Sequence, residues 1–489
     1  MHQIELFMKY PVDVQYEWML SLVRDAAETQ YGRDHGFAEI NSYRQFRENI
    51  PLNDYESLKP LIERTRRGEQ NLIWHSEIKW FAKSSGTTDK SKFLPVSQES
   101  LDGCHYNAGR DMVTLYCNNN PDTQLFTGKS LALGGSFKED VFGEHHSFHG
   151  DVSAIIIQNL PMWAEFFRAP DVNIALMDEW ESKLEQMAIS MMDENVTSIA
   201  GVPSWMLVLI KRVMDKKNVS AITDVWPNLE VYFHGGVSFA PYREQFNRLM
   251  GNKTINYLQL YNASEGFFGI QDQNVSDEML LMLDYGIFYE FIEVKDQLEG
   301  NTSRIINIED VKTGVDYAMI ITTNAGLWRY QIGDVIQFTS TNPYRFTISG
   351  RTRQHINVFG EELMVHNTDA ALAVACERTK ALVKDYTVAP VFMAKDSGAH
   401  EWLIEFEREP NNFEFFCSVL DEALKKQNSD YEAKRYNNFV LQFPVIKALP
   451  PESFYKWLKK NNKLGGQHKV PRLSNDRKIL EEMLELSAK

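Results

Sequence analysis

Short apolar runs alternate with segments of helical spacing between residues 130 and 340 of this chain. The apolar runs are the predicted strands of this region: residues 130–133, 154–157, 229–233 and 257–261. Between them, residues 180–192 and 205–214 carry apolar side chains at the three- and four-residue intervals of amphipathic helices. Strands that alternate with helices are typical of a sheet covered by helices. The pattern therefore predicts an α/β fold for the larger part of the chain.

The segments on either side of this region have different patterns. The first eighty residues are predicted to be helical, with Pro11 at one helix start and Asp54 as the acidic cap of another. Short strands dominate residues 281–340, which indicates an antiparallel or barrel-like β appendage. After Gly350 we predict helices at 367–377 and 413–426 and strands at 386–392 and 402–406. We therefore expect a large N-terminal domain, residues 1–349, and a small C-terminal α+β domain, residues 350–489.

Composition excludes several classes of function. The chain of 489 residues has 51 Lys and Arg against 67 Asp and Glu, a formal net charge of −16. Such a chain lacks the positive field that draws proteins to nucleic acid or anionic lipid, so we expect no nucleic acid and no membrane as partners. Glu5 and Lys9 interrupt the start before a signal-peptide core develops, and no apolar run has the length of a membrane span. The four cysteines show no CxxC spacing, which favours reduced thiols. We expect a cytoplasmic protein.

The polar segment SSGTTDKSK, residues 84–92, has the composition of an anion-binding loop. Its glycine lets a ligand approach the backbone, its hydroxyls and amides donate hydrogen bonds to phosphate oxygens, and its lysines neutralise charge. It is not a Walker A loop, because the GxxxxGK[ST] pattern is absent. The alternative is a solvated polar loop.

Two further segments follow predicted strands. Gly235 and Gly236 come after the strand at 229–233, and paired glycines allow a flat ring to lie on the backbone. In YNASEGFFG, residues 261–269, Glu265 stands between a hydroxyl and a glycine and could hold a Mg²⁺ ion that bridges phosphates. The alternatives are an ordinary glycine turn and an acidic residue in water.

The last two segments are WRYQIGDV, residues 328–335, and SGRTRQHINVFG, residues 349–360. Asp334, in a predicted glycine turn, could accept hydrogen bonds from both hydroxyls of a ribose, and a plain turn is the alternative. Arg351 begins a basic connector. Each of the five segments is a weak signal alone, so their order along the chain carries the argument.

In that order the segments resemble the motifs of the adenylate-forming (ANL) superfamily of acyl-CoA synthetases, luciferases and peptide-synthetase adenylation domains. Within it, the chain most resembles the Gretchen Hagen auxin-responsive family of acyl acid–amido synthetases. The resemblance rests on SSGTTDKSKFLP (84–95), YNASEGFFG (261–269), WRYQIGDVIQF (328–338) and GQHKVPR (466–472), and it covers essentially the whole chain. It implies an ANL-type fold with a small, mobile C-terminal domain. It also suggests that some of the family's leading residues are missing here.

The resemblance implies an ATP-dependent ligase with two half-reactions. A small carboxylic acid attacks the α-phosphate of ATP and gives an acyl-adenylate and pyrophosphate; an amine, from an amino acid, then takes the acyl group and AMP leaves. Because an anion approaches a polyanion, the first step needs charge neutralisation and in-line positioning. The implied cofactors are ATP and Mg²⁺, and the implied partners are the two small substrates. The sequence does not indicate an oligomeric state.

The resemblance also assigns roles to individual residues. The implied nucleotide-binding residues are Ser84, Ser85, Gly86, Thr87, Thr88, Lys90, Gly235, Gly236, Val237, Tyr261, Asn262, Ser264, Glu265, Asp334 and Arg351. The implied catalytic residues are Lys92, Lys469 and Glu265, and Glu265 is also the implied metal ligand. Arg351 is expected near the pivot of the small domain. Arg110 and Trp205 are expected walls of the acid site, with a surface arginine and a core tryptophan as the alternatives.

Two other functions remain open from the sequence. In an acyl-CoA ligase of the same superfamily, coenzyme A would replace the amine, but the Gly-Lys pair expected for that class is absent near Lys469. A non-catalytic nucleotide-binding relative is the second alternative. No GxSxG pattern offers a nucleophile, so we do not expect a covalent acyl-enzyme.

Overall fold

The computed structural model describes residues 1–84, 92–236, 239, 242–351, 355–356, 358–359, 361, 363–392, 398–435, 441–461, 463–464 and 469–487. The chain forms two compact units. The first consists of residues 1–237, 249–332 and 336–347, and the second of residues 238–248, 333–335 and 348–489. The expected division at residues 349 and 350 stays a prediction, because the second unit also takes segments from earlier in the chain.

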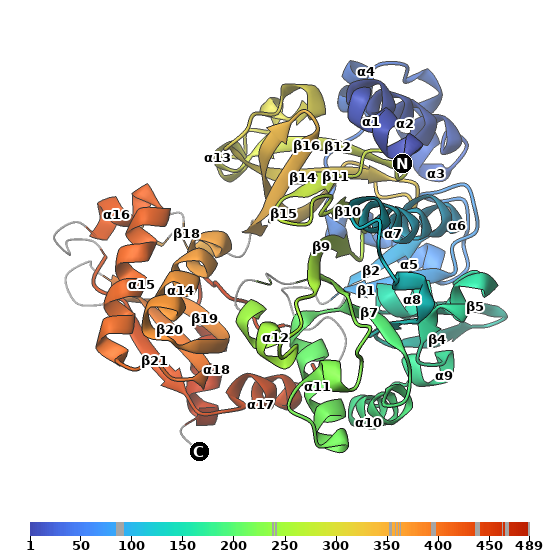
Figure 1. Ribbon diagram of the computed structural model, residues 1–489. Coiled ribbons are helices and arrows are strands. Elements are labelled where there is room, and N and C mark those ends of the chain that lie inside the picture. Colours follow the sequence, from blue (N-terminus) through green and yellow to red (C-terminus); the bar gives the residue numbers. More distant parts are fainter. Residues whose placement is uncertain are drawn as a thin grey trace. The chain divides into compact units, whose positions relative to one another are not determined.

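The first unit opens with helices, as the sequence predicts (Figure 1). They are α1 (His2–Lys9), α2 (Pro11–Asp25), α3 (Gln30–Asp34), α4 (Tyr43–Asn49) and α5 (Tyr55–Arg66). Pro11 is the first residue of α2, a position where its missing N–H has no helical partner to lose. Asp54 caps α5, because its carboxylate accepts a hydrogen bond of 3.0 Å from the backbone N–H of Ser57. Both predicted helix starts are confirmed.

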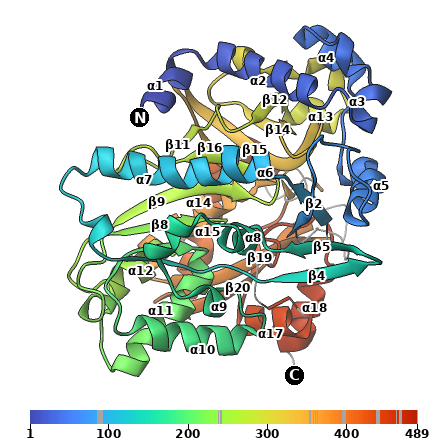
Figure 2. The same ribbon diagram turned by 90° about the vertical axis from the view of Figure 1, so that its right-hand side faces the viewer.

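One large sheet, for which the described residues supply twelve strands, runs through the first unit (Figure 2). Its parallel half has the order β9-β8-β7-β3-β6. These strands are β3 (Lys129–Ala132), β6 (Arg168–Ala169), β7 (Val196–Gly201), β8 (Val231–Gly235) and β9 (Asn256–Ala263). The strands predicted at 130–133, 229–233 and 257–261 are confirmed to within two residues at each end.

The other half of the sheet continues from β9 by antiparallel pairing. Its strands are β10 (Gly266–Ile270), β11 (Met279–Leu281), β12 (Ile287–Glu293), β13 (Ile306–Asn307), β14 (Asp316–Thr323), β15 (Tyr330–Thr341) and β16 (Tyr344–Arg351). Strand β10 pairs antiparallel with β9 and β11, β11 with β16, and β12 with β13 and β14. The antiparallel character predicted for residues 281–340 is confirmed, and these strands belong to the same sheet as β9.

The strand predicted at residues 154–157 is wrong. This segment lies in helix α8 (Val152–Gln158), which follows Asp151. Ala154, Ile155 and Ile157 are all buried. A helix buried on several sides presents a nearly continuous apolar run, and over four residues such a run cannot be told from a buried strand.

A smaller sheet has the order β2-β1-β5-β4. Its strands are β1 (Trp80–Ser84), β2 (Lys92–Val96), β4 (Phe137–Phe142) and β5 (His145–Gly150). Strands β1 and β2 are antiparallel and consecutive, so the polar loop predicted to bind an anion joins them. After β2 the chain continues into α6 (Gln98–Ser100), the π-helical turn η2 (Leu101–Tyr106) and α7 (Asn107–Asn119).

Helices connect and cover the strands of the parallel half. They include α9 (Val172–Ala175), α10 (Trp180–Met191) and α11 (Pro203–Lys217), and α13 (Val294–Leu298) follows β12. Helix α12 (Arg243–Leu249) follows β8 in the chain and belongs, up to Arg248, to the second unit. The helices predicted at 180–192 and 205–214 are thus confirmed as α10 and α11. Helix α7 packs along β8 and β9, where the Tyr116 ring meets Phe233 edge-on at 5.9 Å between centres (Figure 2). In the described part of the chain, no helix is long and apolar enough to cross a membrane.

The second unit is an α+β structure. Its sheet consists of β19 (Leu382–Phe392), β20 (Gly398–Arg408) and β21 (Val445–Leu449), and its other elements are β17 (His355–Ile356), β18 (Leu363–Met364), α14 (Val365–Thr379), α15 (Phe413–Gln427), α16 (Ser429–Arg435), α17 (Ser453–Lys460) and α18 (Lys478–Ser487). Trp402 and Ile404 of β20 pack in one core with α14 and α15, whereas Leu403 between them packs with α17 and α18. The predicted α+β character is confirmed.

Candidate functional site

The parallel strands end at one edge of the large sheet, and two motif segments begin there. Gly235, the last residue of β8, pairs with Leu260 of β9. The glycine turn after β8 therefore lies beside residues 261–263, which extend β9 beyond β8. Open α/β sheets bind ligands outside the carboxyl ends of their strands. The fold thus brings Gly235, Gly236 and Tyr261 to the edge where a ligand is expected.

Gly235 lies too close to β9 to carry a side chain. A Cβ atom at this position would be 2.6 Å from the carbonyl oxygen of Leu260, which belongs to the backbone of a paired strand. Gly236 has a φ of +79°, in the left-handed region that glycine adopts readily. No side chain of Gly235 or Gly236 covers the backbone of this turn. A planar ring can stack on a backbone that is uncovered in this way.

Ser264 and Glu265 form the two-residue turn between β9 and β10, since Ala263 pairs with Gly266. Ser264 is 4% exposed, whereas Glu265 is half-buried. Glu265 comes two residues after the carboxyl end of β9. It therefore lies at the same edge of the sheet as the glycine turn.

Tyr261 and Asn262, at the end of β9, have different surroundings. The Tyr261 ring packs against Phe268 and Phe346, at 4.9 and 6.0 Å between ring centres. The side-chain oxygen Oδ1 of Asn262 is buried and accepts no hydrogen bond from any described residue. A buried acceptor without a donor is costly unless a ligand supplies one, and the amino group of a nucleobase is such a donor. Asn262 therefore offers, at this edge of the sheet, a buried acceptor that a ligand can use.

The two residues that flank the predicted anion-binding loop pair with each other. Ser84 and Lys92 are register partners in the β1–β2 hairpin, and both are half-buried. The Lys92 ammonium lies 5.7 Å from the centre of the Tyr55 ring. The predicted site residues that lie outside the described part of the chain are Ser85, Gly86, Thr87, Thr88, Lys90 and Val237.

The segment that follows β2 contacts strand β10, next to the turn that contains Glu265. The backbone N–H of Phe267, two residues after Glu265, donates a hydrogen bond of 3.2 Å to Sγ of Cys104 in η2. Burial raises the pKa of the Cys104 thiol to about 12, so the sulfur is protonated at neutral pH. This contact connects the segment after the predicted anion-binding loop with the β9–β10 hairpin.

The structure gives the positions of three other predicted residues within their own elements, but it does not show that they lie at this edge of the sheet. Asp334 is 4% exposed in the interior of β15, so the turn predicted around it is wrong: Gly333 takes a φ of +87° and the strand continues through it. Arg351 is the last residue of β16. Lys469 is exposed beside the buried Val470. That these residues share one site stays a prediction.

Arg110 and Trp205, the two predicted walls of the acid site, differ in their exposure to solvent. The Arg110 side chain is 52% exposed on α7 and donates hydrogen bonds to Asp111 at 3.1 Å and Gln3 at 3.4 Å, as a surface arginine does. Trp205 is 8% exposed in the first turn of α11, just after the carboxyl end of β7. Its ring meets that of Trp180 edge-on at 4.4 Å between centres. Trp205 therefore lies at the edge where a ligand is predicted, and only Trp205 is carried into the further inference below.

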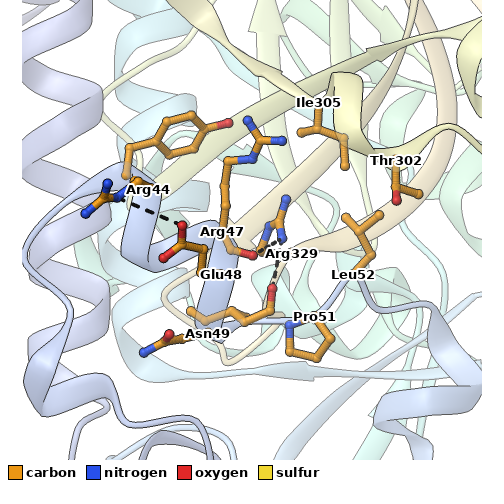
Figure 3. A pocket seen from close by; sticks show the side chains of 11 residues that line it. Arg44, Arg47, Glu48, Asn49, Pro51, Leu52, Thr302, Ile305 and Arg329 are labelled. Atoms are coloured by element: carbon orange, nitrogen blue, oxygen red, sulfur yellow. Dashed lines mark hydrogen bonds and ion pairs between the residues drawn. The ribbon is translucent and has the colours of Figure 1, made fainter.

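A pocket of about 750 Å³ lies elsewhere in the first unit, beside helix α4 (Figure 3). Its lining residues are Tyr43, Arg44, Arg47, Glu48, Asn49, Ile50, Pro51, Leu52, Thr302, Ile305 and Arg329. None of them belongs to the predicted site. This pocket therefore gives no support to the site that the motifs predict.

Arg329, within the WRYQIGD motif, has a structural role that the sequence analysis missed. Its guanidinium donates to both carboxylate oxygens of Glu290, at 2.8 and 2.9 Å, and to the carbonyl of Ile50 at 2.8 Å. The Tyr43 hydroxyl donates to the same carboxylate at 3.0 Å. The Arg329 and Glu290 side chains are 5% and 1% exposed. An arginine directly flanked by two large aromatic residues was the available signal, because a buried charge needs a partner.

His105 in η2 is a buried histidine with a predictable effect on stability. Burial lowers the pKa of His105 to about 4, against roughly 6.5 in an unfolded chain. Between these values the unfolded chain binds a proton that the folded protein excludes, so stability is lost as the pH falls from 6.5 toward 4. We expect His105 to lower the free energy of unfolding by about 2 kcal/mol between pH 7.5 and pH 5.

Urea unfolding of a His105→Leu variant at both pH values checks this expectation. The variant should lack that component of the pH dependence, whereas His2→Leu, at an exposed position, should retain it. Equal pH dependence in the His105→Leu variant and the parent protein would contradict the assignment.

Comparison with known proteins gives a family match over most of the chain. The model of the GH3 family N-terminal domain matches residues 1–255, that of the GH3 family central domain matches residues 280–351, and that of the GH3 family C-terminal domain matches residues 366–478.

Individual relatives are distant in sequence but similar in length. The chain is 22% identical to the 4-substituted benzoates-glutamate ligase GH3.12 of Arabidopsis thaliana, over 89% of this chain and 88% of that protein. It is 22% identical to a jasmonoyl–L-amino acid synthetase, JAR6, of Nicotiana attenuata, over 94% of this chain and 90% of that protein. Among solved structures, the GH3.15 acyl acid amido synthetase superposes with a TM-score of 0.79 at 18% identity, covering 97% of this chain and 93% of that one. A 2-hydroxyisobutyryl-CoA ligase superposes with a TM-score of 0.61 at 12% identity, covering 97% and 91%. These structures share the fold of this chain.

Proposed function

The chain belongs to the GH3 family, and on that premise we propose that it is an ATP-dependent acyl acid–amido synthetase. It activates a small carboxylic acid as the acyl-adenylate and transfers the acyl group to the amine of an amino acid. The named relatives join acids such as benzoates or jasmonate to amino acids. The observation that carries the proposal is the β9–β10 hairpin, which places the unsatisfied Asn262 acceptor and the Glu265 carboxyl group at the ligand-binding edge of the sheet.

The nucleotide is proposed to bind at this edge. The bare backbone of Gly235 and Gly236 supports the adenine ring, and Oδ1 of Asn262 accepts a hydrogen bond from its amino group. The loop between Ser84 and Lys92 supplies hydroxyl, amide and ammonium donors to the phosphates. Asp334 is proposed to accept from the ribose hydroxyls. Tyr261 and Ser264 support this edge from their buried positions.

Glu265 is proposed to hold Mg²⁺. Its half-buried position at the turn fits an ion that takes one protein carboxylate and completes its shell with phosphate oxygens and water. When bound, the ion would neutralise charge on the phosphates. Lys92 adds a positive charge beside the phosphate loop, where an acid anion must approach a polyanion.

The second half-reaction needs less charge stabilisation from the protein than the first. An acyl-adenylate is already a strong acylating agent, so orientation of the two substrates and a deprotonated amine suffice. Lys469 and Arg351 are proposed to act from the small domain, with Arg351 near its pivot. We also propose a cytoplasmic location, because thiols without disulfides at Cys104, Cys117, Cys376 and Cys417 fit a reducing compartment.

The proposal is tested by exchange of labelled pyrophosphate into ATP with a panel of benzoates, indole-3-acetate, jasmonate and alkanoic acids. We expect exchange that depends on one or more of these acids. With an amino acid added, mass spectrometry should show an amide. A thioester formed only with coenzyme A would favour an acyl-CoA ligase instead, and ATP binding without exchange for any acid would favour a non-catalytic relative.

A further inference from the structure

The order of the parallel strands defines a second position at the ligand-binding edge. From β3 the chain continues to β6 on one side, and from β7 it continues to β8 on the other side, while β3 and β7 are neighbours. Ligands of open α/β sheets bind at such a topological switch point. The segments that leave β3 and β7 here are residues 133–136 and residues 201–203.

The segment after β3 is fixed by a buried lysine. The Lys183 ammonium, on a side chain 1% exposed, donates to the carbonyls of Gly134 and Gly135, both at 2.7 Å. On the opposite side, Asp151 accepts from the backbone N–H of Ser136 at 3.3 Å. A Cβ atom at Gly135 would lie 1.7 Å from the Asp151 carboxylate, so the turn admits only glycine there. The turn is thus held between a cation and an anion.

The helix that carries Lys183 also contacts the other side of the switch point. Trp180, one turn earlier on α10, packs edge-on against Trp205, which follows β7. Leu133, the residue that enters the fixed turn, is half-buried and lies close to Gly201, since a Cβ atom built at Gly201 would be 3.3 Å from the Leu133 Cβ. The first turns of α10 therefore connect the two segments that bound the switch point.

The ammonium is charged under neutral conditions. Burial lowers the pKa of Lys183 to about 8, and the nearby carboxylates of Asp151 and Asp178 act in the opposite direction. Hydrogen bonds from a charged donor are stronger than those from a neutral donor. The charged ammonium therefore holds the turn more firmly than a neutral donor would.

A purely structural role for the lysine predicts a different result. If Lys183 only stabilised the fold, its loss would change the free energy of unfolding without a selective effect on one substrate.

We propose that Lys183 is a positioning residue for the acid substrate: by fixing the Gly134–Gly135 turn it sets Leu133 at the switch point, where the apolar body of the acid binds between Leu133 and Trp205. This inference rests on the proposed function and deepens it.

The deciding variant is Lys183→Met, which keeps the length of the side chain and removes the ammonium. Exchange kinetics are measured with the acid that the panel identifies as best. We expect the KM for the acid to rise at least tenfold, while the KM for ATP and the rate at saturating acid change less than threefold. The matched control is Lys216→Met, which removes the partner of Glu185 farther along α10 and should leave all three constants unchanged.

A Leu133→Ala variant decides the question if Lys183→Met does not fold. It widens the acid site without touching the lysine and should raise the KM for the acid, not that for ATP. Acid KM values within twofold of the parent in the folded variants would overturn the inference and leave the proposed function intact, and so would a parallel rise in both KM values. Absence of exchange in the parent protein with every acid would instead overturn the proposed function, and this inference with it.

Discussion

Replacing Glu265 with glutamine is expected to lower acid-dependent pyrophosphate exchange about 100- to 1,000-fold, the usual effect of removing one group that stabilises charge in a transition state. The glutamine side chain has the same shape, but it is neutral and binds Mg²⁺ poorly. Glu265 is half-buried in a two-residue turn, so the fold should persist. Exchange rates at saturating ATP and acid, measured over a range of Mg²⁺ concentrations, give the comparison.

The control for this variant is Glu299→Gln, at an exposed position after α13, which should exchange at the parent rate. Circular dichroism and the melting temperature show whether each variant is folded. Parent-like exchange in folded Glu265→Gln, with unchanged dependence on Mg²⁺, would remove Glu265 from the metal role.

Arg329→Met is expected to destabilise the protein by about 3–5 kcal/mol, because it leaves the buried Glu290 carboxylate without its charged partner. The arginine also satisfies the Ile50 carbonyl, which would lose its donor. Its φ of +39° places Arg329 in the left-handed region, a conformation that the pair and its hydrogen bonds maintain. Urea unfolding at pH 7.5 measures the loss.

The matched control is Arg44→Met in the same pocket. The Arg44 side chain is 83% exposed and reaches Glu48 only at 3.9 Å, so its loss should cost less than about 0.5 kcal/mol. The Arg329→Met/Glu290→Gln double variant should be less destabilised than the sum of the single variants, because no unpaired charge remains. A loss below about 1 kcal/mol for Arg329→Met would contradict the structural role assigned to this motif residue.

Local chemistry explains which elements the sequence predicts well. Pro11 and Asp54 act through contacts within one helical turn, so the residues alone indicate where α2 and α5 begin. Strands β3, β8 and β9 are short apolar runs between polar or glycine residues, and they were found to within two residues. The apolar run in α8 has the same local appearance, and only its burial among other elements distinguishes the helix.

The features that were missed depend on residues far apart in the sequence. From the sequence, Lys183 looks like any polar residue of an amphipathic helix. It is buried because it binds the carbonyls of a turn nearly fifty residues earlier in the chain. The partner of Arg329 is Glu290 on β12, 39 residues away. Asp334 was predicted in a turn because Gly-Asp is usual in turns, whereas pairing with neighbouring strands keeps it inside β15. The fold brings the glycine turn and Glu265 to one edge of the sheet, where ligand binding stays a prediction, and the motifs did not indicate the contacts made by Lys183 and Arg329.

The central claim is that the acid is activated by direct attack on the α-phosphate of ATP, and transfer of labelled oxygen tests it most directly. The protein is given its best acid with both carboxylate oxygens replaced by ¹⁸O, together with ATP and an amino acid, and the products are analysed by mass spectrometry. The account predicts one ¹⁸O in the AMP that is released and one in the amide. Unlabelled AMP, or label in inorganic phosphate formed together with ADP, would contradict it.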